Sequence, residues 1–63
     1  MSIKKQANSY LDGVISYYQK QQSSNLELYN KTGGLIPFIK FSENTETLEV
    51  LYNLKYELNV NHN

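Results

Sequence analysis

Apolar and polar residues alternate through the C-terminal stretch of the chain, residues 47–60. Every second position there is apolar: Leu48, Val50, Tyr52, Leu54, Tyr56, Leu58 and Val60. Leu51 is the one apolar residue that falls outside the alternation. Because successive side chains of a β-strand point to opposite faces of a sheet, this pattern is typical of a strand with one buried face. We therefore predict a strand over residues 47–60.

A helix over residues 46–58 is the alternative for the same stretch. Glu49, Asn53 and Glu57 are spaced four residues apart and would share one polar face, and Thr45 could cap the first turn. The residues that would then point inward are Leu48, Leu51, Leu54 and Leu58. This helix would also place Lys55 and Asn59 on its buried side, which favours the strand.

The N-terminal stretch, residues 2–22, has the period of a helix with one broad apolar face. Its apolar residues are Ile3, Ala7, Tyr10, Leu11, Val14, Ile15, Tyr17 and Tyr18. Ser2 is suited to cap the first turn, whereas Lys4 and Lys5 lie where the helix dipole favours acids. Gly13 costs about 1 kcal/mol relative to Ala inside a helix, so it either marks a close approach by another backbone or is tolerated. We expect the helix to end near Gln22.

The middle of the chain is predicted to form a β-hairpin. A short strand at residues 26–30 is followed by the turn-forming residues 30–34 and a return strand at residues 35–41. Pro37 lacks a backbone N–H, so the return strand should lie at a sheet edge or contain a bulge. The predicted fold class is therefore α+β: one domain, residues 1–63, in which an N-terminal amphipathic helix packs on a small antiparallel β-meander.

The predicted C-terminal strand is about twice as long as the return strand beside it. Part of it would remain unpaired, and an open strand edge promotes association. We therefore expect either a bend at Leu51 or a homodimer. In the dimer, the far end of the strand would contact the second chain through Leu54, Tyr56, Leu58 and Val60.

Six tyrosines in 63 residues are the clearest hint of an interaction surface. Tyrosine joins a large apolar ring to a polar tip and is enriched where proteins meet. We assign Tyr10, Tyr52 and Tyr56 mainly to the core, although Tyr56 would also fall within the dimer contact. We assign Tyr17, Tyr18 and Tyr29 to an interface.

Composition excludes several classes of site. Cysteine is absent and the one histidine, His62, lies in a polar tail, so we expect no catalytic, cofactor-binding or metal-binding residues and no enzyme activity. The net charge is zero, which argues against nucleic acid as a partner. The longest apolar run, residues 35–39, is too short for a signal peptide or a membrane span, so we expect a soluble, cytoplasmic protein.

These features favour a small, homodimeric protein-interaction module that binds a larger protein and blocks it. Abundant Lys, Asn, Tyr and Ile without Arg suggest an AT-rich genome, so the most concrete version is a phage or mobile-element inhibitor of a host defence protein, acting in the host cytoplasm. The alternative is a small dimeric transcriptional or nucleic-acid-binding regulator, with Lys4, Lys5 and Lys20 on phosphates.

Overall fold

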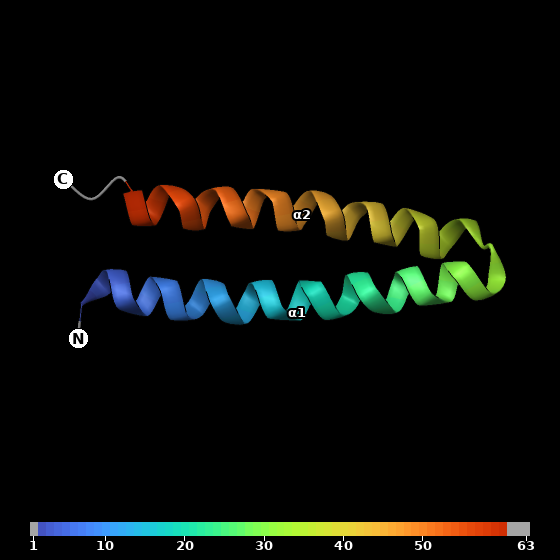
Figure 1. Ribbon diagram of the computed structural model, residues 1–63, viewed down its shortest axis with the longest axis horizontal. Helices are drawn as coiled ribbons and strands as arrows, with labels where there is room; N and C mark the ends of the chain where they lie inside the picture. The colour runs from blue at the N-terminus through green and yellow to red at the C-terminus, as the bar shows by residue number, and fades with distance from the viewer. Residues whose placement is uncertain (1, 61–63) are drawn as a thin grey trace.

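Two long antiparallel helices, joined by a short turn, make up the computed structural model, which describes residues 2–60 (Figure 1). Helix α1 spans Ile3–Thr32 and helix α2 spans Leu35–Val60. The Cα positions extend over 48 × 18 × 11 Å, and their radius of gyration is 14.6 Å. A compact domain of this length would have a radius of about 11 Å. The protein is therefore an elongated helical hairpin, one layer of helices thick.

The α+β prediction is wrong, because residues 2–60 contain no strand. The predicted strand at 26–30 is the last part of α1, which continues ten residues beyond the expected end at Gln22. The predicted strands at 35–41 and 47–60 are both parts of α2. The sheet edge that was expected to join two protomers therefore does not exist.

Each helix places its more buried side chains alternately three and four residues apart, the spacing of two helices that wind around each other. We call these residues the seam. On α1 the seam comprises Asn8, Leu11, Ile15, Tyr18, Gln22 and Asn25. On α2 it comprises Phe41, Asn44, Leu48, Leu51, Lys55 and Leu58. Only Ile15 and Leu48, with 7% and 3% of their surface exposed, are buried among residues 2–60, so the core is very small.

The seam explains why the alternating pattern of residues 47–60 is misleading. Val50, Tyr52, Tyr56 and Val60 supply four of the seven alternating positions and are 46–67% exposed, so these apolar residues lie outside the seam. Lys55 does occupy the seam, as the helical alternative required. Its charge is accommodated by an ion pair with Asp12 on α1. Of the four leucines expected to point inward in that alternative, Leu48 is buried, Leu51 and Leu58 are partly buried, and Leu54 is 49% exposed.

The ends of α1 are closed by local hydrogen bonds. The Ser2 hydroxyl accepts a hydrogen bond from the Lys5 backbone N–H at 3.1 Å, which confirms the predicted cap. Gly33 ends the helix in the left-handed conformation, with φ 65°, and its N–H donates to the Tyr29 carbonyl at 2.7 Å. This conformation is cheap for glycine and costly for other residues.

The turn lies within the predicted segment 30–34 but joins two helices instead of two strands. The Gly34 N–H donates to the Thr32 hydroxyl at 3.1 Å. A Cβ on Gly34 would lie 3.2 Å from both the Thr32 hydroxyl and the Pro37 ring, so the tight turn favours glycine at this position. Pro37 lies in the first turn of α2, where backbone N–H groups lack intrahelical partners and proline is tolerated. The expectation of an edge strand or a bulge at Pro37 is wrong.

Candidate protein-interaction surfaces

One flank of the hairpin is polar, and its side chains bridge the two helices. Asp12 pairs with Lys55, and the Gln19 side-chain amide donates to the Tyr52 hydroxyl at 2.9 Å. Three of these residues directly follow a seam residue in the sequence and lie on the same side of the hairpin. We call this side, with Asp12, Gln19 and Tyr52, the polar flank.

Further amide contacts join the helices along their length. The side chains of Asn8 and Asn59 form reciprocal hydrogen bonds of 3.1 and 2.8 Å near the open end. The Asn25 side chain donates to Asn44 at 2.8 Å in a part-buried layer of the seam. Gln22 donates to the Thr45 hydroxyl at 2.9 Å. These pairs satisfy polar groups that a larger core would replace with apolar residues.

The opposite flank is apolar over the half of the hairpin nearest the chain ends. Residues that directly precede a seam residue lie there, as Val14 precedes Ile15 and Leu54 precedes Lys55. Residues three or four positions away share the same face of their helix. The apolar flank therefore comprises Tyr10, Val14, Tyr17, Val50 and Leu54. Four of them, all except Val14, are 49–72% exposed.

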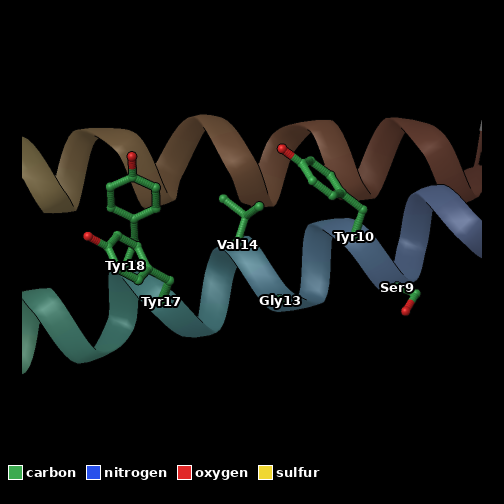
Figure 2. A pocket seen from close by; sticks show the side chains of 6 residues that line it. All are labelled: Ser9, Tyr10, Gly13, Val14, Tyr17 and Tyr18. Carbon is green, nitrogen blue, oxygen red and sulfur yellow. The ribbon is translucent and has the colours of Figure 1, made fainter.

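A groove with a volume of about 530 Å³ lies over α1 on the apolar flank. Its floor and walls are formed by Ser9, Tyr10, Gly13, Val14, Tyr17 and Tyr18. Figure 2 shows Tyr10 and Val14 projecting from α1 to one side, with Gly13 between them and Ser9 directed away. The ring of Tyr17 packs edge-on against Tyr18, with ring centroids 5.2 Å apart, which fixes one wall.

Four of the groove residues have the spacing of a knobs-into-holes site. Tyr10, Gly13, Val14 and Tyr17 occupy positions i, i+3, i+4 and i+7, the four residues that surround a knob from a facing helix. Apart from its two chain neighbours and the backbone of its own helix, no atom lies within 4 Å of a Cβ built on Gly13, so the hole is open among the described residues. The close approach considered for Gly13 therefore does not occur within the described part of the chain.

The closed end of the hairpin carries a second exposed apolar cluster. Leu35, Ile36, Phe38 and Ile39, which we call the apolar tip, are 70%, 68%, 46% and 45% exposed. Phe38 also packs on Tyr29 of α1, with ring centroids 5.5 Å apart. The tip is thus attached to both helices and is held next to the turn at Gly33.

The predicted interface residues lie in several different places. Tyr17 lines the groove with 56% of its surface exposed, Tyr18 is half-buried in the seam, and Tyr29 lies under Phe38. On α2, Leu54 belongs to the apolar flank, Leu58 belongs to the seam, and Tyr56 and Val60 are exposed elsewhere. Residues two apart on a helix point about 200° apart, so these four cannot form the common edge that a strand would give them.

The tyrosine assignments are also revised. Tyr10, Tyr52 and Tyr56, assigned to the core, are 72%, 46% and 67% exposed, so that assignment is wrong. Tyr10, Gly13, Val14 and Val50, and the apolar tip, were missed as candidate interaction residues. The i, i+3, i+4, i+7 spacing from Tyr10 to Tyr17 is visible in the sequence and was the signal for the groove.

The lysines do not gather into one patch. Lys55 pairs with Asp12, and Lys31 lies 3.6 Å from the Glu27 carboxylate one turn earlier on α1. Lys20 lies 15 residues beyond Lys5 on the same helix, which corresponds to roughly 22 Å along the axis. The three lysines considered for phosphate contacts therefore do not form one surface.

No protein-family model, curated protein or solved structure matches this chain. Neither α1 nor α2 contains a stretch that is long and apolar enough to cross a membrane. Among residues 2–60, no three His, Cys, Asp or Glu side chains gather as they would around a metal ion. His62, the one histidine, lies outside the described residues.

Proposed function

We propose that this chain is a non-enzymatic protein-interaction module that binds a larger protein through its apolar tip. The observation that carries the proposal is the exposure of Leu35 and Ile36, at 70% and 68%, at the closed end of the hairpin. Contiguous apolar surface of this kind marks interaction sites on proteins. The tip offers four apolar side chains within five residues.

The energetics of the tip suit an anchor. Complete burial of a Leu, Ile or Phe side chain contributes about 1.5–3 kcal/mol relative to full exposure, so the partly exposed tip side chains could together supply a few of the roughly 8 kcal/mol of a micromolar affinity. Because Phe38 packs on Tyr29 and Gly33 closes α1, the tip would lose little conformational freedom on binding. Such preorganisation reduces the entropic cost of association.

Residue usage supports a more specific version of this proposal. In that version a phage or mobile element encodes the chain, and the partner is a host defence protein that the bound tip blocks. The hairpin needs no catalytic group for such a role, because occupying a functional surface of the target is sufficient.

The test is affinity purification from a bacterial host, with the chain as bait and Ile36→Ser as the tip variant. The matched control is Ile3→Ser, which makes the same change at an isoleucine that is 83% exposed at the open end. We expect a partner that is enriched by the parent chain and by Ile3→Ser and is depleted by Ile36→Ser. Equal enrichment by both variants would overturn the tip as the binding site.

Vesicle flotation separates a protein partner from a lipid surface, which apolar tips can also enter. We expect the chain to stay with the unbound fraction in the presence of neutral or anionic vesicles. Flotation that is abolished by Ile36→Ser and retained by Ile3→Ser would overturn the protein-binding proposal in favour of lipid. The regulator alternative receives no support from the dispersed lysines, and we expect no gel shift with DNA at low salt.

A further inference from the structure

The hairpin exposes more surface than a compact protein of its mass. Its accessible surface is 4948 Å² for 7.3 kDa. A compact protein of this mass exposes about 4,200 Å², so the excess is roughly 750 Å². Each partner in a standard-size interface buries about 800 Å². The excess therefore matches the area that one stable protein interface would cover.

The two flanks differ in whether they need such a cover. On the polar flank, Asp12, Gln19 and Tyr52 are engaged by partners across the hairpin. On the apolar flank, Tyr10 and Leu54 are 72% and 49% exposed, and the hole around Gly13 contains no knob. Domains bury apolar helix faces by adding a second layer, which this hairpin lacks.

We propose that the second layer is another copy of this chain, packed on the apolar flank to form a four-helix bundle. In this homodimer, α1 of one copy packs antiparallel on α2 of the other, and the two-fold axis runs parallel to the helices. The inference goes beyond the proposed function, because it concerns the apolar flank and leaves the tip free. Both tips would then lie at the same end of the bundle.

The pairing of α1 with α2 within one hairpin identifies the residue that would act as the knob. Asp12 contacts Lys55, and Asn8 contacts Asn59, so Leu54 on α2 is level with Gly13 on α1. Rotation about a two-fold axis parallel to the helices does not shift residues along that axis. Residues at one height in the first copy therefore lie at the same height in the second. Leu54 of each copy therefore faces the hole around Gly13 of the other, and its side chain is the knob.

Charge favours stacking α1 on α2 over stacking each helix in parallel on its own copy, where identical charges would face each other. The face of α1 that would meet α2 of the other copy carries no charged residue from Ala7 to Leu28; its members are Ala7, Tyr10, Val14, Tyr17, Gln21, Ser24 and Leu28. The corresponding face of α2 carries Lys40, Glu43 and Glu57. Placing α2 against an uncharged α1 avoids like charges across the interface. The chain also has zero net charge, so two copies do not repel each other at long range.

Light scattering coupled to gel filtration tests the dimer directly. We expect the parent chain at micromolar concentration to have twice the chain mass of 7.3 kDa. Leu54→Lys should halve the measured mass, while Tyr56→Lys, at a 67% exposed position off the flank, should leave it unchanged. A parent chain that has the mass of one copy would overturn the proposal, as would equal effects of the two lysine variants.

Gly13→Leu separates loss of the interface from loss of the fold. Within one hairpin the new side chain enters open space, and leucine favours helix more than glycine does. We therefore expect undiminished helicity by circular dichroism together with a halved mass. A Gly13→Leu protein that keeps the dimer mass would show that the hole is not at the interface.

Engineered cysteines test the arrangement of the helices, since the chain has none of its own. Mixing Gly13→Cys with Leu54→Cys under oxidation should give a covalent dimer of one of each, and either variant alone should crosslink far less. Efficient self-crosslinking of Gly13→Cys would place α1 against α1 and overturn the proposed two-fold axis. Ile36→Ser should leave the mass and the crosslinks unchanged. The dimer can therefore fail or hold independently of partner binding through the apolar tip.

Discussion

Replacement of Leu48 by alanine tests the seam, because Leu48 is the most buried apolar residue among residues 2–60, with 3% of its surface exposed. Leucine-to-alanine changes at buried sites cost about 2–5 kcal/mol, and a site that can collapse costs least. Since the hairpin is one layer thick, we expect about 2–3 kcal/mol. The stability of a domain of this length is only about 3–9 kcal/mol, so the loss is a large fraction of the total.

Thermal and urea unfolding followed by circular dichroism measure this cost. A change of this size should lower the melting temperature by roughly 10–20 °C. The matched control is Leu35→Ala, the same change on the same helix at a 70% exposed position, and it should fall within about 0.5 kcal/mol of the parent. Equal costs at the two positions would refute the seam, because Leu48 would then be no better packed than the exposed Leu35.

Two further changes probe other parts of the hairpin. Lys55→Leu removes an ion pair whose side chains are 39% and 58% exposed and adds apolar surface to the seam, so the urea midpoint should rise by the equivalent of about 0.5–1.5 kcal/mol. A lower midpoint would mean that the pair stabilises more than the burial it displaces. Gly33→Ala imposes the left-handed conformation on a residue with a Cβ and should cost about 1 kcal/mol in the same assay; a neutral result would contradict the αL cap.

The sequence predicted the parts of the fold that depend on local chemistry. Ser2 was expected to cap the first helix and does, and the Gly33-Gly34 turn falls where the composition placed it. The second helix was given only as the alternative over residues 46–58, because polar residues such as Asn44 and Lys55 in its seam conceal the helical period. Those residues are tolerated through partners on α1, and a pairing between distant segments is not visible in either segment alone.

The candidate surfaces could be predicted only in part. Tyr17 and Leu54 were named as interface residues and lie on the apolar flank, but Tyr56 and Leu58 were grouped with Leu54 by a strand geometry that does not hold. The apolar tip was predicted to be the return strand of a β-hairpin, because a run of apolar residues after two glycines fits either a strand or the start of a helix. Its exposure follows from the absence of a second layer of helices, a tertiary property.

The two-residue turn also determines the order in which the hairpin can fold. Tyr29 and Phe38, beside the turn, are nine residues apart in sequence, whereas Asn8 and Asn59 at the open end are 51 apart. Loop-closure entropy makes the second contact about 1.5 kcal/mol more costly to form directly, so pairing should start at the turn and progress as a zipper. The open end then forms last and should exchange its amide hydrogens first. The groove over Gly13 lies in that half, so a second copy bound there would stabilise the part of the hairpin that opens most readily.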